Sequence, residues 1–251
     1  MSSAVEAQAA ADAAALAAGV VVAAVSTPNE LDVLRATMEN VWGPEIVPPR
    51  NLLRGLALGG ACLLVAHRDD TPVGFALGWL GWEGGVHFHS HQVGVQSGLR
   101  GRGVGFALKL AQRALCLQHG VTEMRWTFDP LLYSNARFNL VRLGARAVGF
   151  FPHCYGERRD AFNTGDTTDR LEVSWQLDVP VGGAEVLASD GDLIGVPRDY
   201  PALRVAEPAD GAAARSRTGD AFSALFAAGG SVLGWSVDGY VVSPSLREAT
   251  S

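Results

Sequence analysis

The chain has 251 residues, 48% of them apolar, and a formal net charge of −6. Such a length can bury the core of one large domain, or of a domain with an extension. A nucleic-acid protein should carry a basic face, so the acidic balance predicts no nucleic-acid partner. No apolar run reaches the roughly 18 residues of a membrane span, which predicts no membrane partner.

The N-terminal segment and the cysteines give no sign of export. Residues 1–19 are rich in alanine, but the first basic residue is Arg35, so the basic start of a signal peptide is missing. We expect these residues to form a flexible tail, either frayed or helical. Cys62, Cys116 and Cys154 are far apart and have neither disulfide nor metal spacing. Reduced thiols fit a cytoplasmic protein best.

Strand and helix signals then follow one another in a mixed α/β order. Val20–Val25 is a short β-branched run, and Thr27-Pro28 is typical of a helix start. Val73–Trp82 alternates large side chains with Gly74, Ala76 and Gly78, so another element should pack close to the small face. The further predicted elements are helices from Pro48-Pro49 to Gly59-Gly60, from Val104 to about Gly120 and over 134–143, and strands at Cys62–Ala66, Val86–Val95, Met124–Phe128, Ala145–Phe151 and Leu171–Leu177.

The composition changes after residue 178. Residues 178–218 are rich in Gly, Pro, Ala and Asp, which predicts an irregular linker. A short helix should follow Asp220, and Asp238-Gly239 between two apolar runs predicts a hairpin. We therefore expect a tail over 1–19, a main domain over 20–178 and an irregular linker with a small helix and hairpin extension over 179–251.

A glycine-rich and arginine-rich stretch, residues 100–105, lies between a predicted strand and a predicted helix N-terminus. Helix N-termini bind anions through unpaired N–H groups and the helix dipole. Glycines let the backbone approach a phosphate, and arginines add charge for it. The spacing differs from the G-x-G-x-x-G of dinucleotide-binding folds, which disfavours a nicotinamide-dependent oxidoreductase. A plain connection with two solvated arginines is the other alternative. The stretch consists of Arg100, Gly101, Arg102, Gly103, Val104 and Gly105.

These residues resemble the R/Q-x-x-G-x-G/A loop with which the GNAT acyltransferase superfamily holds the pyrophosphate of acyl-CoA. Val93-Gly94-Val95 is similar to its splayed fourth strand, whose backbone pairs with the pantetheine arm, and Asn135–Ala145 is similar to its later N-x-x-F…L-G segment. The resemblance covers roughly residues 21–177 and implies a GNAT fold, an α/β (α+β) mixed sheet, with a C-terminal extension. It implies that Val93, Val95, residues 100–105 and Asn135 bind acyl-CoA. Simple helix capping is the alternative for Asn135.

Three further segments resemble a less-studied GNAT branch associated with acylation of amino acids, including N-succinyl transfer. They are His89-Ser90-His91, Leu108–Arg113 and Trp126–Leu131. The resemblance implies acetyl-CoA or succinyl-CoA as the co-substrate and the primary amine of a small molecule, such as an amino acid, as the acceptor. It implies direct attack on the thioester without a metal. Many members of the superfamily pair, so a homodimer is one expected state.

Three alternating histidines, His87, His89 and His91, should share one face of a predicted strand. An amine that attacks a thioester must lose a proton, and histidine is the natural base near neutral pH. His89 is the first choice, because it lies six residues before Val95, where some family members carry a catalytic carboxylate; His91 is the second. Packed structural histidines are the alternative. Zinc is disfavoured because its ligands normally come from more than one element.

The acid that protonates the leaving thiolate is less well defined. In the family, a Tyr commonly follows the Phe of the later segment, but this chain has Asn139 there. Tyr155 and Tyr133 are substitutes by residue type, and ordinary packing is the alternative for both. A CoA thiolate can also leave unaided, because the pKa of a thiol is about 8.5. The missing Tyr favours the rival hypothesis, a non-catalytic acyl-CoA sensor or interaction module.

Overall fold

The computed structural model describes residues 3–156 and 166–244 of the chain. These residues form two compact units. The first holds residues 3–125 and 176–178, and the second holds residues 126–156, 166–175 and 179–244. This division differs from the expected organisation into a tail, a domain over 20–178 and an extension. The expected organisation stays a prediction.

A seven-stranded mixed sheet has the strand order β1-β2-β3-β4-β5-β7-β6. Neighbours among the first four strands are antiparallel, whereas β5 runs parallel to β4. The mixed α/β sheet confirms the expected fold class. The strands are β1 (Val21–Ala24), β2 (Cys62–Arg68), β3 (Thr71–Gly81), β4 (His87–Val95), β5 (Glu123–Phe128), β6 (Arg146–Phe151) and β7 (Arg170–Gln176).

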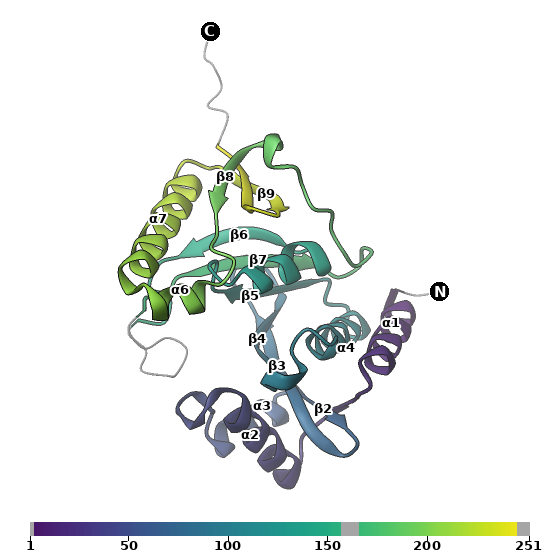
Figure 1. Cartoon of the computed structure of the whole chain (residues 1–251). Helices are drawn as coiled ribbons and strands as arrows, with labels where there is room; N and C mark the ends of the chain where they lie inside the picture. The colour runs from purple at the N-terminus through teal and green to yellow at the C-terminus, as the bar shows by residue number, and fades with distance from the viewer. Residues whose placement is uncertain (1–2, 157–165, 245–251) are drawn as a thin grey trace. The chain divides into compact units, whose positions relative to one another are not determined.

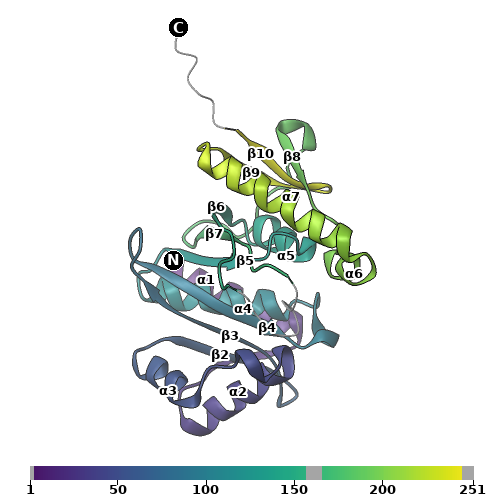
Figure 2. The same cartoon turned by 90° about the vertical axis from the view of Figure 1, so that its left-hand side faces the viewer.

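Helices cover both faces of the sheet in the first unit (Figures 1 and 2). Helices α2 (Pro28–Trp42) and α3 (Arg50–Leu58) lie on one face, and α4 (Val104–Gln118) lies on the other. Short 3₁₀ turns at Pro44–Ile46 and Ser97–Leu99 lead into α3 and toward α4. None of the described helices is long and apolar enough to span a membrane.

The two faces of β3 differ as the sequence predicts. Phe75 and Leu77 are buried in the cluster that includes Leu31 of α2. On the opposite face, a Cβ at Gly74 would lie 3.3 Å from Val104 Cγ1 at the start of α4. The small residues therefore let α4 approach the sheet closely, which confirms the prediction of a close neighbour.

The N-terminal segment is helix α1 (Ser3–Ala18), which lies alongside α4. Ala7 and Ala11 are fully or almost fully buried. Arg68 of β2 donates hydrogen bonds to the carbonyl oxygens of Ala18 and Gly19, which holds the end of the helix on the sheet. The helical form expected as one alternative for residues 1–19 is thus the one observed, and it is packed rather than frayed.

The second unit contains the helical segment predicted over 134–143 and the predicted hairpin. The helical segment is α5 (Tyr133–Arg137) followed by a π-helical turn, Phe138–Arg142. The hairpin pairs β9 (Ser231–Ser236) with β10 (Gly239–Ser243), and β8 (Asp192–Gly195) adds a third strand in the order β8-β10-β9.

The expectation of an irregular linker up to residue 218 is wrong over its second half. Helices α6 (Tyr200–Ala206) and α7 (Pro208–Ala227) occupy it. The two glycines of α7 do not break the helix but permit close packing. A Cβ at Gly211 would lie 2.8 Å from Arg204 Cα, and one at Gly219 would lie 3.2 Å from Asp169 Oδ2. Pro208 occupies the first turn, where proline is compatible with a helix.

A buried ion-pair network holds α7 within the second unit. The Arg215 side chain, 5% exposed, donates two hydrogen bonds of 2.7 Å to the two oxygens of Asp129. It also donates to both oxygens of Asp166, at 3.0 and 2.8 Å. Tyr200 and Arg204 of α6 donate to Asp166 Oδ2 as well. Burial opposes the charge of Asp166, but the hydrogen bonds and the charge of Arg215 lower its pKa below the ordinary 3.8.

We expect Arg215→Leu to lower the free energy of unfolding by about 3–5 kcal/mol, because two carboxylates would remain buried without their cation. Urea unfolding measures this loss. Arg204→Leu is the control: its guanidinium is more exposed and its contact with Asp166 is longer, at 3.3 Å, so its loss should be smaller, about 1 kcal/mol. The stability that Asp166 adds should disappear as the pH falls through its lowered pKa. Equal losses in the two variants would contradict the prediction.

Candidate active site

Strand β4 separates from β5 halfway along its length. The parallel pairing joins Phe88 to Met124 and His89 to Arg125, and it does not continue. On its other edge, β4 remains paired with β3 as far as Val95. The backbone groups of β4 between Ser90 and Val95 that point away from β3 therefore have no paired strand beside them among the described residues. An extended ligand with amide groups, such as a pantetheine arm, could pair with this edge.

The glycine-arginine loop follows β4 directly. Gly101 and Gly103 have φ values of 75° and 90°, in the left-handed region that favours glycine. Arg100 and Arg102 are both exposed, and Arg100 Nε donates a 3.4 Å hydrogen bond to Val95 O. The loop thus presents bare backbone and two cations at the same place.

The N-terminus of α4 is open. Its N-cap, Gly103, provides no side-chain hydrogen bond, and the first turn contains no acidic residue. The first N–H groups of a helix have no intrahelical partner and carry the positive end of the dipole. Val104 is buried against the sheet, whereas a Cβ at Gly105 would meet only Val95 Cγ2, at 3.7 Å. These features suit a phosphate or pyrophosphate.

An aromatic cluster lies on the α2 side of β4. The rings of His89 and His91 are 5.5 and 4.9 Å from that of Trp79 and 5.9 Å from each other. His87 is on the same face but is buried, and its Nδ1 is 2.9 Å from Gly85 O. The structure therefore brings together His89 and His91, the two preferred histidines, and assigns His87 a packing role. Among the described residues, no group of three His, Cys, Asp or Glu side chains could hold a metal.

His89 is half-buried, and its environment disfavours the charged form. Burial, followed by the effects of His91, His87 and Lys109, lowers its pKa to about 4. The ring is therefore neutral near pH 7 and can accept a proton, although it is a weaker base than an exposed histidine.

A polar network lies on the opposite, α4 side of the strand. Lys109 is 3% exposed, and its Nζ donates a 2.8 Å hydrogen bond to Ser90 Oγ. Ser90 Oγ donates in turn to Gln112 Oε1 at 2.8 Å. Burial lowers the pKa of Lys109 well below its usual value, against the opposing effect of Cys116 and Cys62. The sequence pattern missed this network, because the segment reads as an ordinary amphipathic helix.

The remaining candidates belong to the second unit. Asn135 is exposed in the first turn of α5, whose cap is Leu132 without a side-chain hydrogen bond, so the capping alternative for Asn135 is wrong. Tyr155 Oη is 3.3 Å from Thr127 Oγ1 on β5. Tyr133 donates its hydroxyl proton to Val237 O, which engages it within the extension.

The side chain at position 139 has a structural role. Asn139 is buried, and its Oδ1 accepts a 3.2 Å hydrogen bond from the indole N–H of Trp126. The residue that replaces the expected Tyr thus satisfies a buried donor. Of the two substitute acids, Tyr155 has the more accessible hydroxyl, since its side chain is 41% exposed.

A comparison with known protein families covers β4, the loop of positive-φ glycines and the open helix N-terminus. Residues 31–139 match the family model described as the Acetyltransferase (GNAT) family. Over these residues the chain therefore has a GNAT acetyltransferase domain, the type of domain that transfers acyl groups from CoA.

Solved structures show the same fold. The ribosomal-protein-S18-alanine N-acetyltransferase from Escherichia coli is 11% identical, over 67% of this chain and 99% of that one, with a TM-score of 0.50. The yncA protein from Salmonella typhimurium, solved with its cofactor acetyl-CoA, is 18% identical over 66% and 99%, with a TM-score of 0.50. Ard1 from Thermoplasma volcanium is 15% identical over 63% and 97%, also at 0.50. None of the curated proteins compared with the chain matches it.

We expect Gly103→Ala to weaken acyl-CoA binding by about tenfold, because Ala in the left-handed region costs about 1–2 kcal/mol and shifts the loop. Isothermal titration with CoA measures the effect. Gly98→Ala is the matched control, since its added Cβ would meet nothing within 4 Å and its φ is not positive. Unchanged affinity in Gly103→Ala would show that this loop conformation does not hold CoA.

We expect Lys109→Met to stabilise the fold, and to do so more at pH 6 than at pH 9. Because burial lowers the folded-state pKa of Lys109, the folded state disfavours the charged amine, and this cost is greater at the lower pH. Urea unfolding of both proteins at the two pH values measures the difference. A larger stabilising effect at the higher pH would contradict a lowered pKa of Lys109 in the folded state.

Proposed function

We propose that this protein is an acyl-CoA-dependent N-acyltransferase that moves an acetyl or succinyl group to the primary amine of a small molecule, such as an amino acid. The junction of β4 and α4 carries the proposal. It combines an unpaired strand edge, two positive-φ glycines, two exposed arginines and an open helix N-terminus.

The donor would lie along this junction. The backbone of Val93 and Val95 would pair with the pantetheine arm, and residues 100–105 would hold the pyrophosphate. Arg100 and Arg102 would neutralise part of its charge. Asn135 of the second unit is proposed as a further contact to the acyl-CoA arm.

The acceptor amine would lose its proton to His89, directly or through water, with His91 as the second candidate. As the C–N bond forms, the nitrogen becomes positively charged and much more acidic, so a neutral histidine of low pKa can accept the proton. Tyr155 is proposed as the acid for the CoA thiolate. The thiolate can also leave unprotonated, because the pKa of a thiol is about 8.5.

A non-catalytic acyl-CoA sensor is the second candidate function. The observation that favours it is the hydrogen bond of Asn139 to Trp126, which gives a structural role to the position where the family commonly has a Tyr. In either case we propose a cytoplasmic protein without a metal, a nucleic-acid partner or a membrane partner, with a homodimer as one expected state.

We expect amine-dependent release of CoA thiol from acetyl-CoA or succinyl-CoA, and a drop of about 10²-fold in kcat for His89→Ala. Ellman's reagent, applied with a panel of amino acids and polyamines, measures this release. Because the pKa of His89 is about 4, its titration should leave kcat/KM unchanged above about pH 6.

The controls separate the two functions. His87→Ala should leave kcat within a few-fold of the parent, since that ring is engaged by Gly85 O. Full activity of His89→Ala would retain the enzyme and remove His89 as the base. Tight CoA binding without turnover on any amine would favour the sensor.

A further inference from the structure

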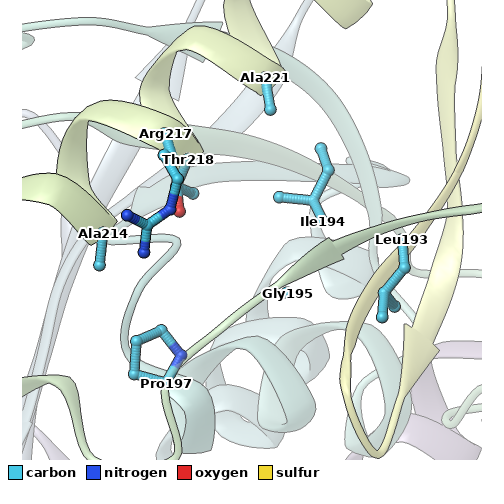
Figure 3. Close-up of a pocket in the computed structure, with 8 residues that line it drawn as sticks. All are labelled: Leu193, Ile194, Gly195, Pro197, Ala214, Arg217, Thr218 and Ala221. Atoms are coloured by element: carbon cyan, nitrogen blue, oxygen red, sulfur yellow. The ribbon is translucent and has the colours of Figure 1, made fainter.

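We propose that the C-terminal region contains a binding site for a small organic carboxylate, which shares no residue with the β4–α4 junction. A cavity of about 370 Å³ lies between β8 and α7 (Figure 3). Ile194, Pro197, Ala214 and Ala221 supply apolar walls, and Arg217 and Thr218 supply the polar groups. Ligand pockets commonly combine apolar walls with a few polar groups in this way.

Arg217 is the cation available in this cavity. Its guanidinium extends from α7 between Ala214 and Pro197 (Figure 3). Within the described ranges, the side chain of Arg217 makes no ion pair or hydrogen bond. Two neighbouring arginines are engaged elsewhere: Arg215 binds Asp129 and Asp166, and Arg198 donates to Tyr133 and lies over its ring.

Thr218 supplies a hydroxyl to the same cavity. The residue is 4% exposed and lines the cavity together with Arg217 (Figure 3). The nearby Asp220 of α7 accepts a hydrogen bond from Ser216 Oγ at 3.3 Å. A ligand oxygen could therefore accept hydrogen bonds from the guanidinium and from the hydroxyl.

The lining limits the class of ligand. One guanidinium matches the charge of one carboxylate, whereas a phosphate dianion would need additional donors to replace its water. Ile194, Pro197 and Ala221 add apolar surface beside the polar groups, so a ligand with a small alkyl group could contact both kinds of surface. A volume of about 370 Å³ is at the lower end of the range for small-molecule sites. A short-chain carboxylic acid is the simplest compound that meets these requirements.

Hexanoate is the probe for this site, with hexanamide and inorganic phosphate as comparison ligands. The measurement is a titration of the full chain followed by amide chemical shifts in NMR. We expect saturable shifts at residues 193–197 and 214–221, with a Kd for hexanoate of about 1 mM or lower. Hexanamide should bind at least about tenfold more weakly, because it lacks the charge.

Three variants test which residues are responsible. Arg217→Gln should weaken hexanoate binding by about tenfold, because it removes the cation. Ala221→Leu should weaken it by filling the cavity, without a change in charge. Arg146→Gln is the charge-matched control, since Arg146 is an exposed residue of β6 outside the cavity, and it should leave the affinity unchanged.

Several results would overturn the proposal. They are the absence of saturable shifts, equal affinity in Arg217→Gln and the parent, or equal weakening in Arg146→Gln. Phosphate binding as tight as hexanoate binding would overturn the assignment to a carboxylate. The titration requires neither acyl-CoA nor turnover, so its outcome does not depend on the proposed acyltransferase reaction.

Discussion

Strand β4 is held by β3 along one edge while its other edge leaves β5 after His89, and the candidate site depends on this separation. Gly94 lets the strand pack closely on β3, because a Cβ there would lie 2.5 Å from the ring of Phe75. A strand paired along one edge can offer the backbone groups of its free edge to a ligand with little reorganisation. The loop of positive-φ glycines then directs the chain into α4, so the backbone edge and the helix N-terminus are consecutive.

The same strand separates two chemical environments. Toward α2 it presents His89 and His91 beside Trp79, and toward α4 it presents Ser90, bonded to Lys109. A buried lysine is costly unless it is neutral and hydrogen-bonded. Its burial follows from the position of α4, which has the sheet on one side and α1 on another. The alanine-rich start of the chain is therefore part of the packing around the site.

Periodicity and turn residues were sufficient to predict the strands of the seven-stranded sheet, the loop, α4 and the hairpin, because each has a local signal, whereas β8 was not predicted. Only the end of helix α7, after Asp220, was predicted, because the composition of residues 178–218 was interpreted as that of a linker. Gly211 packs closely against Arg204 of α6, and Gly219 lies near Asp169, contacts that no local composition indicates. The histidine pair was predicted from strand alternation. The partners of Tyr133 and Lys109 lie on other elements, so no local pattern could indicate that their side chains are engaged.

Two arginines of α7 show how one helix can serve both stability and binding. Arg215 and Arg217 are about 200° apart around the helix axis, so they face different surroundings. Arg215 is consumed by two buried carboxylates, whereas Arg217 lines the cavity beside β8. Tyr240 packs on Phe222 of α7 at 5.0 Å and donates a hydrogen bond to Pro130 O. These contacts fix α7 within the second unit, so a carboxylate bound beside β8 would leave the helix in place and order mainly the exposed Arg217 side chain.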